Sequence, residues 1–102
     1  MANFFRVQGK GHSFEDMVNF NSAISAELDE IDYHGVCCTD SVCGLRNYIQ
    51  FASDENDEVV IFSGQQTGEL YDGVVAIPER ELARTSISDF MTNDRWFDYE
   101  AW

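Results

Sequence analysis

The chain has 102 residues, of which 44% are hydrophobic and 14% aromatic, so residues 1–102 hold enough apolar material for the core of a single domain and too little for two. Asp and Glu number 19 and Lys and Arg number 6, which gives a formal net charge of −13. This charge excludes direct binding of nucleic acid through a basic face, and an anionic membrane surface would repel the chain.

The first third of the chain predicts a strand followed by a long helix. Residues 3–8 are typical of a short strand, and the glycines within 9–11 turn the chain. Ser13 suits the N-cap of a helix, and apolar residues recur at helical spacing over 14–31. We therefore expect an amphipathic helix over 14–31 that buries one stripe.

The next segment, 34–44, has no period and contains all three cysteines, Cys37, Cys38 and Cys43. We expect irregular backbone against the core and reduced, buried thiols that act as small hydrophobes. Together with His34 the cysteines would supply four zinc ligands. However, adjacent cysteines in a strand point to opposite faces, and the C-x2-C spacing of structural zinc sites is missing.

Strand patterns return in the middle of the chain. Residues 45–53 and 58–63 are β-prone, and the acidic residues 54–57 between them are typical of a turn, so we expect a hairpin. A further β-prone run, 70–77, follows a glycine-flanked turn at 64–68. A three-stranded antiparallel meander is the simplest arrangement.

The last part of the chain predicts short helices. Pro78 suits the first position of a helix over 78–84, and residues 86–92 predict a second short helical piece. The expected fold class is α+β: a three- to four-stranded antiparallel sheet with one long N-terminal helix and one or two short C-terminal helices packed on it.

The sequence carries no sign of export or membrane insertion. No apolar run approaches the ~20 residues needed to span a bilayer. Residues 1–6 lack the charged and apolar regions of a signal peptide. We expect a cytoplasmic protein.

No pattern typical of an active site is present. His12 and His34 lie far apart, and neither stands in a motif that places a nucleophile beside a base. Residues 9–13 lack the order of a phosphate-binding loop, and 54–58 lack the glycine of a calcium-binding loop. We therefore expect no enzymatic activity, no cofactor and no metal.

The carboxylates gather in clusters that Lys and Arg do not compensate locally. The clusters are Glu27, Asp29, Glu30 and Asp32; Asp54, Glu55, Asp57 and Glu58; Glu69 and Asp72; and Asp94, Asp98 and Glu100. The first cluster falls at the C-terminal turn of the expected helix, where the dipole makes each anion cost about 0.3–1 kcal/mol. We predict that these residues bind a partner. An acidic surface kept for solubility or for high salt is the alternative.

An anionic face of this kind suits a cationic protein. Carboxylates one helical turn apart are separated by about 5–6 Å, comparable with the spacing of about 3.4 Å between phosphates along a nucleic-acid strand. Such an array can occupy the Lys/Arg-lined groove of a nucleic-acid-binding protein, and long-range attraction raises the association rate. The aromatic residues Trp96, Phe97, Tyr99 and Trp102 either anchor the partner or dock onto the core, and docking is the favoured interpretation.

In size, acidity and lack of catalytic residues the chain resembles small phage and mobile-element proteins that disarm bacterial defence nucleases, among them anti-CRISPR proteins and antirestriction DNA mimics. Its tail, Trp96-Phe97-Asp98-Tyr99-Glu100-Ala101, is similar to an aromatic-x-Asp-Tyr-Glu-Ala stretch of ArdA-type antirestriction proteins. The resemblance implies a phage protein that acts in the bacterial host cell as a nuclease inhibitor. By DNA mimicry it would block DNA access to a CRISPR effector or restriction enzyme. No individual residue role is carried over.

Two other functions remain open. An immunity protein that neutralises a basic nuclease toxin would also be small and acidic, and a toxin gene beside its own would favour it. A small enzyme or metal-binding regulator is the other, and stoichiometric zinc would favour it.

Overall fold

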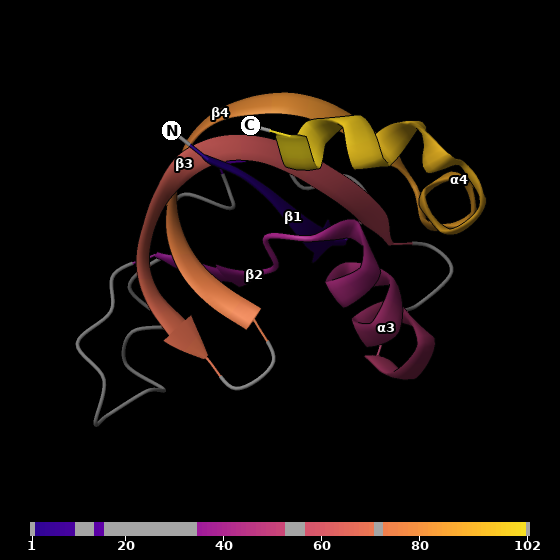
Figure 1. Ribbon diagram of the computed structural model, residues 1–102, viewed down its shortest axis with the longest axis horizontal. Helices are drawn as coiled ribbons and strands as arrows, with labels where there is room; N and C mark the ends of the chain where they lie inside the picture. Colours follow the sequence, from indigo (N-terminus) through magenta and orange to yellow (C-terminus); the bar gives the residue numbers. More distant parts are fainter. Residues whose placement is uncertain (1, 10–13, 16–34, 53–56, 71–72, 102) are drawn as a thin grey trace.

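The computed structural model describes residues 2–9, 14–15, 35–52, 57–70 and 73–101. Within these ranges the elements are β1 (Ala2–Gln8), β2 (Val36–Cys38), α3 (Val42–Ala52), β3 (Glu58–Leu70), β4 (Gly73–Ser86), α4 (Ile87–Thr92) and the 3-10 helix η1 (Asp94–Ala101) (Figure 1). The strand expected at 3–8 is present as β1, and the short helix expected at 86–92 is present as α4.

The four strands form one antiparallel sheet in the order β1-β3-β4-β2. Its centre is the long, strongly curved hairpin of β3 and β4 (Figure 1). Register shifts along this pair mark bulges, which bend strands and increase their twist. The curvature of the sheet brings its two outer strands together. Phe5 of β1 and Thr39, just after β2, exchange two backbone hydrogen bonds of 2.9 Å.

Gly64 and Pro78 face each other at one of the bulges. A Cβ on Gly64 would lie 2.4 Å from the carbonyl oxygen of Ile77, so only glycine permits this approach. Proline is tolerated at a bulge because its missing N–H is not needed there. The turn expected at 64–68 and the helix expected at 78–84 are therefore wrong, since both stretches are continuous strand.

Side-chain alternation along the strands divides the core into two clusters on opposite faces of the sheet. The Phe62 cluster consists of Phe4, Val36, Cys38, Val60, Phe62, Val74 and Ala76, with Ala2 and Phe14 packed against it. The Trp96 cluster consists of Phe5, Val42, Leu45, Ile49, Val59, Ile61, Phe90 and Trp96. The helices α3, α4 and η1 all contribute to the Trp96 cluster and so cover that face.

The strand expected over 45–53 is wrong, because this stretch belongs to α3. Leu45 and Ile49 lie one helical turn apart and are both buried in the Trp96 cluster. The Ser41 hydroxyl caps the helix by accepting a 3.0 Å hydrogen bond from the Gly44 backbone N–H. Burial of one helical face and a cap outweigh the local β preference.

The expectation of irregular backbone over 34–44 is also wrong for the residues that form β2 and the first turn of α3. Cys38 is buried, Cys37 is half-buried and Cys43 is exposed, and none of these thiols is in a disulfide. The expected burial is therefore confirmed for Cys38 and wrong for Cys43. Burial raises the pKa of the Cys38 thiol to about 12, so this thiol stays protonated and serves as core.

The expected fold class is wrong in its helices. The chain begins with the strand β1, and no long helix occurs in the described residues, where α3 has 11 residues and α4 has 6. Of the helix expected over 14–31, only Phe14 and Glu15 are described, and both are helical; 16–34 lie outside the described residues. No helix in the described ranges combines the length and apolarity needed to cross a bilayer.

Candidate functional site

The carboxylates predicted to bind a partner are only partly visible in the structure. Those outside the described residues are Glu27, Asp29, Glu30, Asp32, Asp54, Glu55 and Asp72. Those that the structure describes are Asp57, Glu58, Glu69, Asp94, Asp98 and Glu100.

The described clusters are not brought together into one patch. Glu58 begins β3 and pairs in register with Ser86, next to α4, whereas Glu69 pairs with Val74 at the far end of the same hairpin. In Figure 1 this far end and η1 lie on opposite sides of the molecule. The last cluster is described in full, and its three carboxylates lie on a single element, η1.

Arginines are held within the molecule by the carboxylates around them. Arg84 pairs with Glu81 at 2.7 Å and with Glu58 at 3.4 Å. Arg95 pairs with Asp89 at 2.9 Å, and Arg46 pairs with Asp94 at 3.5 Å. Solvent-accessible pairs contribute only about 0–1 kcal/mol each, and these pairs are partly accessible. Because these arginines are already paired, they are not available to pair with the other carboxylates of the chain.

Several exposed carboxylates make no ion pair within the described part of the chain. Glu69 lies on β3, Glu79 on β4 and Asp98 on η1, and all three are exposed. Asp98 stands on the same short helix as Asp94 and Glu100, so η1 carries three carboxylates, more than any other element that the structure describes. We therefore take η1 as the candidate binding surface.

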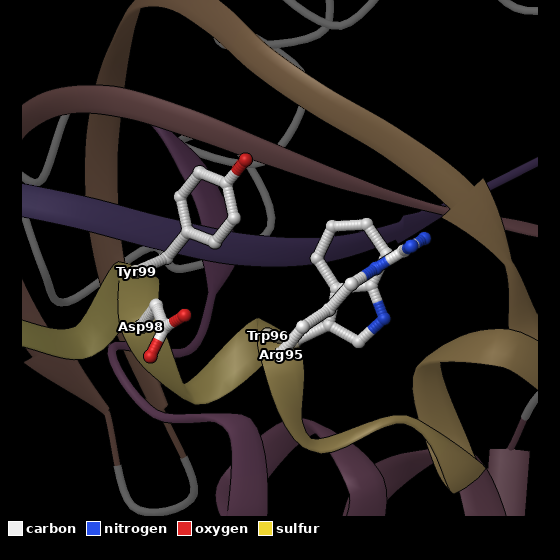
Figure 2. Close-up of a pocket in the computed structure, with 4 residues that line it drawn as sticks. All are labelled: Arg95, Trp96, Asp98 and Tyr99. Atoms are coloured by element: carbon white, nitrogen blue, oxygen red, sulfur yellow. The ribbon is translucent and has the colours of Figure 1, made fainter.

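A shallow hollow of about 490 Å³ opens on η1, lined by Arg95, Trp96, Asp98 and Tyr99. In Figure 2 the Tyr99 ring and the Trp96 indole lie next to each other among the residues that line it, with Arg95 in front of the indole. The Arg95 guanidinium lies 4.4 Å from the Trp96 ring centroid, and the Trp96 and Tyr99 rings stack at 5.9 Å. The hollow therefore combines aromatic surface with one cation and one unpaired carboxylate.

Asp89 of α4 holds the Trp96 and Arg95 side chains in place. Its carboxylate accepts hydrogen bonds from the Thr85 hydroxyl at 2.8 Å and the Trp96 indole N–H at 3.1 Å, and it pairs with Arg95. The Thr85 hydrogen bond, the Arg95 charge and the Trp96 hydrogen bond lower the pKa of Asp89. Sequence reasoning missed Asp89, although its position three residues after the N-cap Ser86 is a recognisable capping signal.

The lowered pKa of Asp89 predicts a stability that depends on pH. Such a group stabilises the folded state fully above its unfolded pKa, about 3.9, and loses this contribution as pH falls through the folded value. We expect Asp89→Asn to lower the unfolding free energy at pH 7, and we expect the gap to wild type to shrink below about pH 4. Urea unfolding at several pH values measures this gap. Asp98→Asn is the control, and a gap for Asp89→Asn that stays constant with pH contradicts the prediction.

Two further contacts fasten η1 to the rest of the molecule. The Asn3 side-chain amide donates a 3.1 Å hydrogen bond to the Tyr99 carbonyl, and a Glu100 carboxylate oxygen accepts from the Val42 backbone N–H at the start of α3. Trp96 is only 4% exposed. The docking of the aromatic tail onto the core is thus confirmed for Trp96, and Trp102 lies outside the described residues.

Comparison with known proteins identifies no relative. No family model, no curated protein and no solved structure matches the chain. Within the described ranges no group of three or more His, Cys, Asp or Glu residues is placed to hold a metal ion. The features of the described residues that bear on function are therefore their charge and the geometry of η1.

Proposed function

We propose that the chain is an acidic, non-catalytic inhibitor of a bacterial defence nuclease, either a CRISPR effector or a restriction enzyme. It binds the basic groove that receives DNA and prevents DNA from entering. The formal net charge of −13 supports a cationic partner, because complementary charge steers association and fixes orientation.

The observation that carries this proposal is the internal use of the arginines. Arg46, Arg84 and Arg95 are each paired with carboxylates of the chain itself. Exposed carboxylates such as Asp98 and Glu79 have no such partner in the described part of the chain. The negative charge presented to a partner is therefore not offset by these arginines, as a protein that takes the place of DNA requires.

The hollow on η1 supports a specific contact with an arginine or lysine of that partner. Aromatic rings of η1 already accept guanidinium groups, because Arg46 lies 5.0 Å from the Phe97 ring centroid and Arg95 lies over Trp96. Within the described residues no guanidinium covers Tyr99, and Asp98 beside it has no ion pair. A cation of the partner can stack on Tyr99 and pair with Asp98.

The test is inhibition of defence and competition with DNA. We expect expression of the chain to restore phage plating on a restricting or CRISPR-immune host, and we expect affinity capture from that host to recover the nuclease. Duplex DNA should displace the chain from the captured nuclease, and the affinity should fall as salt rises. An affinity that does not change with ionic strength, or simultaneous binding of DNA, would contradict the proposal.

Single charge variants locate the contact. We expect Asp98→Asn to weaken binding up to about fivefold at low salt, as for loss of one exposed ion pair of up to about 1 kcal/mol. Glu69→Gln is the matched control, because it removes the same charge at the far end of the β3–β4 hairpin. A larger loss for Glu69→Gln would show that η1 is not the contact.

A further inference from the structure

The C-terminal end of η1 is tied to two other elements of the fold. The Asn3 side-chain amide of β1 donates a 3.1 Å hydrogen bond to the Tyr99 carbonyl oxygen. The next residue, Glu100, accepts a hydrogen bond from the Val42 backbone N–H of α3. Asp98, which lines the hollow on η1, directly precedes these two residues. Contacts with β1 and α3 therefore fix the backbone next to Asp98.

The N-terminus of α3 depends on the carboxylate of Glu100. The first backbone N–H groups of a helix have no partner within the helix, and the helix dipole favours a negative charge beside them. The Ser41 hydroxyl accepts from the Gly44 N–H, but the first turn of α3 contains no acidic residue. Val42 is fully buried, so water does not reach its N–H. Glu100 supplies both the missing acceptor and the negative charge.

This use of Glu100 divides the three carboxylates of η1. Asp94 pairs with Arg46 of α3 at 3.5 Å, and Glu100 caps the same helix. Asp98 is exposed and makes no ion pair within the described ranges. If Glu100 turned to a cation of a partner, it would leave a buried N–H without an acceptor, which costs free energy. Glu100 therefore suits a role inside the molecule, and Asp98 suits the contact.

We propose that Glu100 is a positioning residue for the η1 surface. By capping α3 it holds the C-terminal end of η1 in place, and it thereby sets the orientation of Tyr99 and Asp98 at the hollow. Glu100 acts through these two residues and does not itself contact the partner. The identity of that partner rests on the proposed function, whereas the cap is a property of this chain alone.

The first test is made on the free protein. Glu100→Ala removes the acceptor, whereas Glu100→Gln keeps a side-chain oxygen and removes the same charge. We expect hydrogen exchange of the Val42 amide to be at least about threefold faster in Glu100→Ala than in Glu100→Gln, as for the loss of a helix cap. We also expect nuclear Overhauser effects between the stacked Trp96 and Tyr99 rings to weaken in Glu100→Ala and to recover in Glu100→Gln.

The control is the exchange of the Ile61 amide in β3, which reports whether the sheet remains folded. Equal exchange of the Val42 amide in the two variants, or unchanged ring contacts in Glu100→Ala, would overturn the proposal. If Glu100→Ala does not fold, Glu100→Asp takes its place, because its shorter side chain withdraws the carboxylate from the Val42 N–H while it keeps the charge.

The second test measures affinity for the captured nuclease. Glu100→Ala and Glu100→Gln remove the same charge, so a difference between them does not come from long-range attraction. We expect Glu100→Ala to bind at least about threefold more weakly than Glu100→Gln, which recovers most of the loss. Equal losses in the two variants would show that Glu100 contributes charge to the contact, and this would overturn the positioning role. If no nuclease is captured, the proposed function fails, and the exchange of the Val42 amide alone decides the role of Glu100.

Discussion

Replacing Phe62 with alanine is expected to lower the free energy of unfolding by about 3–5 kcal/mol, which is a large part of the 5–15 kcal/mol typical of a domain. Phe62 is fully buried at the centre of the sheet. Its ring lies 5.7 Å from Phe4 and 6.4 Å from Phe14. Truncation removes these contacts and leaves a cavity that the closed sheet cannot fill. Urea or thermal unfolding followed by circular dichroism measures the loss.

Phe62→Leu is the control, because it keeps most of the buried volume and should cost less. The contact with Phe14 adds a second readout. A double-mutant cycle of Phe62→Ala and Phe14→Ala should give a coupling energy of about 0.5–1.5 kcal/mol, as for other aromatic pairs. A loss below about 1 kcal/mol for Phe62→Ala, the range of exposed sites, would show that the Phe62 cluster is not the core.

The sheet shows how far local pattern carries a prediction. The residues of β1 and the first part of β3 have clear strand patterns, and both strands are present. The turn expected at 64–68 follows from its glycines, but here Gly64 serves close backbone approach at a bulge. The helix expected at 78–84 follows from Pro78, which instead sits opposite Gly64. Glycine and proline mark irregular backbone, and the sequence does not tell a turn from a bulge.

The helix α3 illustrates the opposite error. Its residues have good β propensity, so a local pattern predicts a strand, yet the Trp96 cluster requires a helix to cover the sheet at this place. Tertiary packing decides between the two. The cap at Ser41 and the helical spacing of Leu45 and Ile49 are the local signals for the helix.

The candidate site was predictable in its charge but not in its arrangement. Composition alone leads to the hypothesis of a cationic partner, and the acids of η1 are among the residues predicted from the sequence to bind it. Ion pairs such as Arg46 with Asp94 join residues far apart in the chain, so sequence does not reveal which carboxylates remain unpaired. The same holds for Arg6, whose half-buried position depends on the meeting of β1 and β2.

Replacing Trp96 with alanine is expected to lower both the stability of the protein and its affinity for the proposed partner. Trp96 is buried in the Trp96 cluster, with its ring 6.4 Å from Phe90, so truncation should cost about 3–5 kcal/mol. It also removes a donor to Asp89 and the ring on which Tyr99 stacks. We therefore expect η1 to detach and the affinity for the captured nuclease to fall, even at temperatures where the sheet stays folded.

Trp96→Phe separates the two effects. The phenylalanine keeps an aromatic ring in the core but loses the indole N–H to Asp89 and part of the buried ring volume, so we expect a smaller loss of stability than for alanine and near-normal binding. Unfolding curves and binding titrations on the same samples measure both quantities. If Trp96→Ala binds the nuclease like wild type while it remains folded, the hollow on η1 does not contribute to the contact. The acidic surface would then act through long-range charge alone, because steering by net charge does not require one ordered aromatic anchor.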